Sequence, residues 1–457
     1  MKKIDSPARD HFHFARFVAL FLAISLFYAL WLVACWPGVL GQDSLAIMLE
    51  VDTQREFQAG KPAFWYLYSK YFYGTWKLVE IPIILQLVVC ALVCARILNW
   101  MARRKFWKSF AYCFFFVALA PSVVYYASSL YSDGIYAIAL AGLLFEVWRC
   151  SHNQRLDSVA CAMLAITLPF ALFSRPNGIL NVVALLYLFW VLGKNSRIAL
   201  LAIALPWCLL AVHANTTYQY RAPIGSVLPL ALYETVGFLE ARPMGLWERN
   251  EPRVSEKTVK ALTSSGKSLE HISKYHDHYY WDPLIFFVEG PALLEISKSA
   301  KKTIVREFFT YNVWHNFPAF AASRVNIFLY SAFANGGIPG PLNAENILPQ
   351  TKSASVFKAY SLPTDSFFLD WFDFSTRLRV IFWTPWLGLT LIALGCTRTV
   401  QHRRAPGAMV CSIYAMQLAA VFVFSIAGEY RYLLAFFTAP LVLLPMLSHL
   451  PTAERNV

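Results

Sequence analysis

The chain has 457 residues, of which 58% are hydrophobic, 16% aromatic and only 15% charged. Soluble domains are about 45–50% apolar and about 25% charged, so this composition excludes an ordinary soluble protein. The net charge of +13 does not indicate a nucleic-acid partner, because basic residues also set the orientation of membrane proteins. The apolar residues gather in blocks of about 18–22, the length that crosses a bilayer, and the mean hydropathy is +0.46.

These blocks predict an all-α polytopic membrane protein with about ten transmembrane helices, interfacial helices and a long, partly helical outer loop. The expected spans are residues 14–36, 81–100, 110–128, 134–149, 159–174, 178–193, 198–214, 379–396, 408–427 and 432–449. The first block has no small-residue cleavage site after it, which indicates an uncleaved helix. The chain is therefore divided into an N-terminal transmembrane module (1–214), a long outer loop or small domain (215–378) and a C-terminal transmembrane module (379–457).

The lysines and arginines predict the orientation. With the N-terminus in the cytoplasm, the inner segments hold 17 of these residues and the short outer segments hold 6, so both termini are expected inside. The nine cysteines all lie in or beside apolar segments, and none falls between residues 215 and 373. This pattern offers no disulfide framework and no cysteine–histidine zinc spacing. The long loop is then expected on the outer side of the membrane.

The first outer loop (37–80) opens with helix-breaking residues and an acid. Pro37 cannot continue a helix, and Gly38 and Gly41 allow tight turns. Asp43 is therefore expected at the membrane surface near the end of the first helix, where a carboxylate can take a proton from a hydroxyl nucleophile. Alternatively, Asp43 is a solvated loop residue or caps the next short helix. The aromatic stretch 64–73 predicts interfacial helices on the membrane.

Each short outer turn carries an acid or an arginine beside an apolar helix. Asp133 lies between the third and fourth spans, Arg175 between the fifth and sixth, and Glu429 and Arg431 between the ninth and tenth. Polar groups at such depth tend to be paired or functional. The alternatives are that Asp133 caps a helix, that Arg175 only reaches toward the headgroups, and that Glu429 and Arg431 pair with each other.

The long outer loop contains a histidine-rich and aromatic stretch. Four histidines could bind a metal, and residues 275–281 would also suit an aromatic ligand surface. Neither spacing is specific, and solvated loop histidines are the favoured interpretation. The four are His271, His276, His278 and His315.

Two carboxylates and two arginines on different helix ends indicate a site at the outer leaflet. Arginine forms bidentate bonds with phosphate oxygens, and carboxylates act as bases or metal ligands. A lipid with a phosphate in its headgroup suits such a site, because its tail can stay in the bilayer. Its headgroup would then meet Asp43 and Arg431.

This arrangement resembles the GT-C superfamily of integral membrane glycosyltransferases, which use polyprenyl-phosphate-linked sugars. The likeness rests on Asp43 just after the first span, Asp133 between the third and fourth spans, and a long outer loop after the seventh. The stretches 174–178 and 429–432 also look like stretches found in bacterial members of this superfamily whose substrates are poorly assigned. Many members have an acidic pair in the first loop, whereas Ser44 follows Asp43 here. This departure leaves the need for a metal open.

The resemblance implies an inverting transfer of a sugar from a polyprenyl-phosphate-linked donor to a glycan, lipid or protein acceptor of the cell envelope, such as lipopolysaccharide. The site would face the periplasm at a bacterial inner membrane. Membrane lipids would surround the site, and no nucleic acid would take part. No cofactor is certain, and Mg²⁺ or Mn²⁺ remains open. By this resemblance Asp43 would be the general base, and Asp133 would bind the acceptor, orient an arginine or hold a metal. Arg175 and Arg431 would bind the donor phosphate, supported by Asn177, Glu429 and Tyr430. The acceptor would be bound by His276, His278 and Trp281.

Two other functions fit the same charges. A transporter or flippase of lipid-linked sugars would use them for recognition without chemistry. Transporters usually place polar residues near the bilayer midplane and often contain inverted repeats, whereas the expected spans have few polar residues at mid-depth and no repeat is visible. A non-catalytic assembly protein, whose long loop binds a partner, would tolerate the loss of Asp43.

Overall fold

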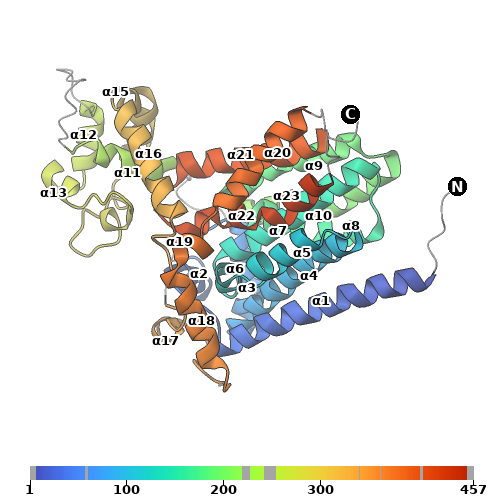
Figure 1. Ribbon diagram of the computed structural model, residues 1–457. Coiled ribbons are helices and arrows are strands. Elements are labelled where there is room, and N and C mark those ends of the chain that lie inside the picture. Colours follow the sequence, from blue (N-terminus) through green and yellow to red (C-terminus); the bar gives the residue numbers. More distant parts are fainter. Residues whose placement is uncertain are drawn as a thin grey trace. The chain divides into compact units, whose positions relative to one another are not determined.

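The computed structural model describes residues 7–56, 60–218, 227–240, 254–338, 340–360, 362–401 and 405–449, with side chains from residue 14 onward. The described residues form helices and no extended strand (Figure 1). The chain divides into two units. The first comprises Met1–Gln219, Ile338–Gln417 and Arg431–Val457, and the second comprises Tyr220–Gly337 and Leu418–Tyr430.

The first unit is a helical bundle made from both ends of the chain. Its N-terminal part contains α1 (Pro7–Ala34), α2 (Gln42–Asp52), α3 (Ala63–Trp76), α4 (Glu80–Arg103), α5 (Trp107–Cys113), the π-helix η1 (Phe114–Ala118), α6 (Pro121–Ala127), α7 (Ser132–Asn153), α8 (Ser158–Phe173), the 3₁₀-helix η2 (Pro176–Asn181), α9 (Val182–Val191) and α10 (Lys194–Thr217). Its C-terminal part contains α17 (Ala344–Ile347), η5 (Leu348–Gln350), α18 (Asp365–Arg377), α19 (Arg379–Phe382), α20 (Trp386–Gln401), α22 (Leu434–Thr438) and α23 (Pro440–Ser448). Helix α21 (Ala405–Phe424) begins in this unit and ends in the second, and η6 (Tyr430–Leu433) follows it.

Seven of the described helical segments are long and apolar enough to cross a membrane. They are Phe14–Ala34, Glu80–Arg103, Ser132–Asn153, Lys194–Thr217, Arg379–Gln401, Ala405–Phe424 and Tyr430–Ser448. Each coincides with one of the ten spans expected from the sequence. The protein is therefore a helical, multi-pass membrane protein.

The other three expected spans have a different form. The span predicted at 110–128 is broken, because Trp107–Ala118 and Pro121–Ala127 meet at a bend of 50°. Proline at the start of α6 lacks the N–H that would continue the helix. The spans predicted at 159–174 and 178–193 are α8 and the segment Pro176–Val191, both shorter than 18 residues. Whether these three segments cross the membrane stays a prediction.

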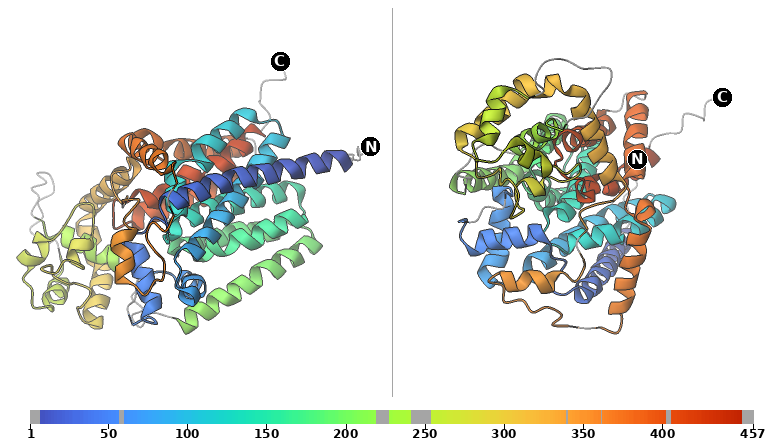
Figure 2. Two further views of the ribbon diagram at one scale, coloured as in Figure 1. Left: turned by 90° about the horizontal axis from the view of Figure 1, so that it is seen from below. Right: turned by 90° about the vertical axis from the view of Figure 1, so that its left-hand side faces the viewer.

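Helix α7 forms the centre of the first unit. In its most apolar window 94% of the residues are buried, against 17% for α10. It contacts α4, α8, α9, α22 and α23, whereas α10 lies at the edge of the bundle (Figure 2). Small residues on α7 allow close approach of neighbouring helices, as is common in membrane bundles. These residues are Ala137, Ala139, Ala141 and Gly142.

A buried charge network joins α4, α7 and α8. The carboxylate of Glu146 accepts hydrogen bonds from Arg96 at 2.9 Å and from Arg149 at 2.8 Å. Arg149 also donates to both carboxylate oxygens of Asp157, the N-cap residue of α8, at 2.7 and 3.0 Å. Glu146 is 1% exposed, so its charge needs both arginines as partners.

The last part of the predicted outer loop packs on the first unit. Asn343 donates to the carbonyl oxygen of Leu40 at 3.1 Å. Helix α18 packs against α1, with Phe372 between Trp31 and Tyr125. The contacts therefore group residues 338–378 with the transmembrane helices, and not with the rest of the 215–378 loop.

The second unit is a small helical cluster with its own apolar core. It contains α11 (Val227–Gly237), α12 (Glu256–Thr263), α13 (Leu269–Lys274), η3 (Asp282–Leu284), α14 (Lys298–Glu307), the π-helix η4 (Phe308–Asn312), α15 (Val313–His315) and α16 (Phe317–Ala332). Buried residues such as Leu232, Leu262 and Ile304 form the core. Arg324 is 1% exposed and is held by Glu234 and by the carbonyl oxygen of Ser425.

Candidate functional site at the helix ends of the first unit

The segment after α1 turns sharply and docks on the end of α6. Gly38 has a φ of +145°, a value that favours glycine and bears out the expected turn. The N–H of Val39 donates to the carbonyl oxygen of Ser128 at 2.9 Å. Helix α2 therefore starts close to the turn between α6 and α7.

Asp43 lies in the first turn of α2, and its carboxylate faces two cations. The N-cap of α2 is Gly41, and no side chain caps the helix, so Asp43 does not act as the cap. Its carboxylate accepts hydrogen bonds from the guanidinium of Arg431 and from the ammonium of Lys61, the latter at 2.5 Å. The side chains of Asp43, Lys61 and Arg431 are 26%, 24% and 10% exposed. The acid of the first loop is thus a partly buried ion-pair partner and not a solvated loop residue.

A second ion pair joins Asp133 to Arg175. Asp133 lies in the first turn of α7, where the N-cap Tyr131 makes no side-chain cap. The next residue, Gly134, approaches α6 so closely that a Cβ atom there would lie 2.4 Å from the backbone nitrogen of Ala127. Arg175 directly precedes η2, which starts with Pro176. The structure therefore pairs two residues that the sequence analysis placed in separate turns.

The ring of Tyr432 connects the two ion pairs. The guanidinium carbon of Arg175 lies 5.1 Å from its ring centre, and that of Arg431 lies 5.4 Å away. Arg431 also lies 4.8 Å from the ring centre of Tyr131. Cations at such distances from an aromatic face are attracted by the ring quadrupole. The two arginines, each bound to an acid, thus share one aromatic support.

The cluster carries an excess of positive charge. Lys61, Arg175 and Arg431 face Asp43 and Asp133, so three cations meet two carboxylates. Burial raises the pKa of the Asp43 carboxyl, but the charges of Arg431 and Lys61 outweigh burial and hold this pKa well below its usual range. Burial also lowers the pKa of Lys61, and the charge of Asp43 partly opposes this lowering.

A divalent metal does not fit these two carboxylates. Each of them already faces a guanidinium group, and the excess positive charge of the cluster would repel a further cation. The same excess charge attracts an anion. Arginine side chains that stack on aromatic rings and present their donors in a plane are well suited to bind a phosphate.

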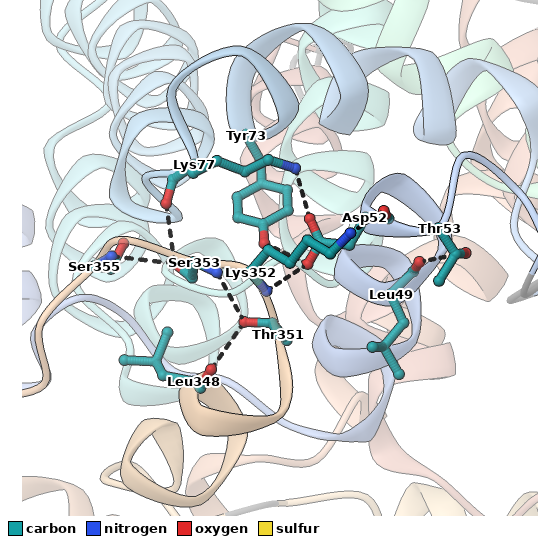
Figure 3. Close-up of polar contacts among 10 residues, drawn as sticks. All are labelled: Leu49, Asp52, Thr53, Tyr73, Lys77, Leu348, Thr351, Lys352, Ser353 and Ser355. Atoms are coloured by element: carbon teal, nitrogen blue, oxygen red, sulfur yellow. Dashed lines mark hydrogen bonds and ion pairs between the residues drawn. The ribbon is translucent and has the colours of Figure 1, made fainter.

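A buried carboxylate anchors the other end of α2 (Figure 3). Asp52 accepts hydrogen bonds from Tyr73 at 3.0 Å, from Lys77 at 2.6 Å and from the backbone N–H of Lys352 at 2.7 Å. Its side chain is 2% exposed. These bonds tie α2 to α3 and to the 351–355 segment. The helix that carries Asp43 is therefore held at its C-terminal end as well.

The predicted supporting residues fall in both units. Asn177 donates to Gln417 at 2.6 Å and lies 3.4 Å from the hydroxyl of Tyr136, so it fixes the turn next to Arg175. Glu429 and Tyr430 belong to the second unit, where the N–H of Tyr430 donates to the carbonyl oxygen of Gly336 at 3.2 Å.

The predicted acceptor-binding residues also belong to the second unit. His276 lies 2.6 Å from a carboxylate oxygen of Glu240, and His278 lies 4.0 Å from the other oxygen. Trp281 is half-buried against the apolar core of this unit. The acceptor role of these three residues stays a prediction.

Two members of the cluster were missed as site residues in the sequence analysis. From the sequence, Lys61 was one of the basic residues of the first loop, and Tyr432 was part of the 429–432 stretch, but neither had a predicted role. The available signal was weak. Lys61 is a basic residue just before the aromatic stretch 64–73, and Tyr432 directly follows Arg431.

The fold and the cluster define a multi-pass helical membrane protein with a charged site where several helices end. No protein-family model, no curated protein and no solved structure matches the chain significantly.

Proposed function

We propose that the protein is a membrane glycosyltransferase that takes a sugar from a polyprenyl-phosphate-linked donor and transfers it to a glycan, lipid or protein acceptor. The observation that carries the proposal is the cluster in which Asp43 contacts Lys61 and Arg431 beside the Asp133–Arg175 pair. An acid and several cations at helix ends suit a substrate whose phosphate lies at the membrane surface while its tail stays in the bilayer.

The cations would bind the donor phosphate and later stabilise the leaving group. Arg431 and Arg175 offer several N–H donors for phosphate oxygens, and Lys61 adds a third charge. When the bond between the anomeric carbon and the phosphate oxygen breaks, negative charge grows on the departing polyprenyl phosphate. Cations already held in position stabilise this charge at little reorganisation cost.

Asp43 would act as general base once the donor is bound. With its pKa held well below the usual range by Arg431 and Lys61, the carboxylate is a weak base at rest. A bound phosphate competes for these cations, so the pKa of Asp43 should rise toward its ordinary value. Asp43 would then take the proton of an acceptor hydroxyl while the hydroxyl oxygen bonds to the anomeric carbon. This direct displacement inverts the anomeric centre.

Asp133 would orient Arg175. The ion pair between them fixes the guanidinium next to Tyr432. Of the three roles considered for Asp133, arginine orientation agrees best with this contact. The proposed location is a bacterial inner membrane with the site on the periplasmic side.

The proposal is tested by measuring sugar transfer in membranes that contain wild-type protein or Asp43→Asn at equal expression. The donors are a panel of radiolabelled polyprenyl-phosphate sugars. Asp370→Asn is a matched control, because Asp370 is exposed on α18 and the chemical change is the same. We expect label transfer by wild type and Asp370→Asn, and a loss of about 10²–10⁴-fold for Asp43→Asn. Equal transfer by Asp43→Asn would exclude the base role. No transfer by any form would favour a transporter or an assembly protein.

A further inference from the structure

The second unit contains a group of three metal-ligating side chains from two separate segments. Glu240, His276 and His278 each offer a ligand atom, and these atoms lie within 4.8 Å of one another. Among the residues that the structure describes, no other such group of three histidine, cysteine or carboxylate side chains occurs. Glu240 and His276 are 36 residues apart in the sequence, so the cluster is created by the fold.

The backbone holds the three side chains in place. Glu240 follows α11, and its N–H donates to the carbonyl oxygen of Gly237. His276 and His278 lie just after α13, on either side of Asp277. The carboxylate of Asp277 accepts hydrogen bonds from the N–H groups of Tyr279 and Tyr280 at 2.7 and 2.9 Å. This turn therefore fixes the histidines independently of any ion.

A second set of contacts fixes the imidazole of His276 against α11. Its ring centre lies 5.2 Å from that of Tyr233, whose hydroxyl donates to the carbonyl oxygen of Asp277 at 2.8 Å. A Cβ atom at Gly237 would lie 3.0 Å from Nε2 of His276, so this nitrogen faces the helix end. Nδ1 lies 2.6 Å from Glu240, which makes Nδ1 the candidate ligand atom.

We propose that Glu240, His276 and His278 bind one transition-metal ion, with Zn²⁺ as the best match. The distances of 2.6 and 4.0 Å from the two histidine Nδ1 atoms to the oxygens of Glu240 bracket the spacing of about 3.4 Å between ligands of a tetrahedral zinc ion. Two imidazoles and one carboxylate favour zinc over Mg²⁺, which prefers oxygen ligands. A fourth position would remain for water or another ligand.

The site is accessible from one side. The side chains of His276, Glu240 and His278 are 7%, 25% and 48% exposed, so an ion can reach the inner ligand past the outer one. Binding would link the end of α11 to the 276–281 segment. This inference is independent of the proposed glycosyltransferase activity, and it assigns His276 and His278 to a metal instead of direct acceptor contact.

Calorimetric titration with Zn²⁺ would test the proposal. The sample is the full-length, untagged protein, from which a chelator has first removed bound metals. We expect one Zn²⁺ per chain and a raised melting temperature. Loss of a second-shell partner alone weakens metal binding by about 10–100-fold, so His278→Ala and Glu240→Gln should weaken it at least about 100-fold. His315→Ala is the control, because it removes a histidine outside the proposed site. Nδ1 of His315 lies 2.9 Å from the carbonyl oxygen of Tyr311.

The proposal would be overturned by the absence of saturable zinc binding, by equal binding in His278→Ala, or by tighter binding of Mg²⁺ than of Zn²⁺. If a variant does not fold, X-ray absorption of the zinc-loaded wild type gives an independent answer. Two imidazole ligands and a carboxylate support the site. A zinc ion without imidazole ligands contradicts it.

Discussion

Asp43 and Arg431 are 388 residues apart in the sequence and form an ion pair. This pair joins the first loop of the chain to the start of its last apolar segment. Lys61 shares the carboxylate, so the stability of the pair and the binding of an anion depend on the same charges. Variants of the residues in this cluster separate these two roles.

A double-mutant cycle should reveal direct coupling between Asp43 and Arg431. Asp43→Asn and Arg431→Gln each remove one partner, whereas the double variant leaves no uncompensated charge in this pair. We expect the loss of unfolding free energy in the double variant to be smaller than the sum of the two single losses by about 0.5–3 kcal/mol. Equilibrium unfolding in mixed micelles measures this value. Arg431→Gln combined with Glu146→Gln is the control pair, and it should be additive within about 0.5 kcal/mol.

The shared aromatic ring should matter for anion binding. Tyr432→Leu removes the surface on which Arg175 and Arg431 lie, while Tyr432→Phe keeps it and removes only the hydroxyl. Each cation–π contact is worth about 0.5–2 kcal/mol. Tyr432→Leu should therefore weaken binding of polyprenyl phosphate at least several-fold in a native mass-spectrometry titration, and Tyr432→Phe should bind nearly as wild type. Equal weakening by both variants would assign the effect to the hydroxyl.

The stability contribution of Asp43 should depend on pH only in acid. Its pKa in the folded protein lies well below the usual range, because Arg431 and Lys61 outweigh the effect of burial. A depressed pKa stabilises the fold above the unfolded-state pKa of about 3.9, and this stabilisation is lost as the pH falls toward the folded-state pKa. The difference in melting temperature between wild type and Asp43→Asn should thus be constant from about pH 5 to 8 and shrink below about pH 4. A decrease between pH 5 and 8 would contradict the depressed pKa.

The anchor at Asp52 should contribute strongly to the stability of the first unit. Asp52→Ala leaves Lys77, Tyr73 and the backbone N–H of Lys352 without their buried acceptor, so we expect a loss of about 3 kcal/mol. Tyr73→Phe removes one hydrogen bond and should cost about 1 kcal/mol. Lys352→Ala is the control, because its backbone N–H still binds the Asp52 carboxylate and only the 3.3 Å bond from its ammonium to the backbone carbonyl oxygen of Asp52 is lost. Unfolding in mixed micelles compares the three variants, and an Asp52→Ala protein as stable as Lys352→Ala would show that the anchor is dispensable.

The helical membrane class was predictable because hydropathy and length act locally. Seven expected spans coincide with long apolar helices. The break before Pro121 was harder to predict from a hydropathy profile, since proline does not reduce the apolar character of a window. The grouping of residues 338–378 with the first unit depends on distant contacts, such as Phe372 against Trp31, that no local pattern encodes.

Hydropathy and the scarcity of charges along the chain identify the helical membrane class and single out Asp43, Asp133, Arg175 and Arg431, because ionisable groups beside apolar helices are costly and therefore conspicuous. Which of these four groups meet depends on the packing of the helices. This packing pairs Asp43 with Arg431 and Asp133 with Arg175, adds Lys61 and Tyr432, and brings Glu240 to the histidines. These contacts join residues far apart in the chain, so they follow from helix packing and not from the spacing of residues in the sequence.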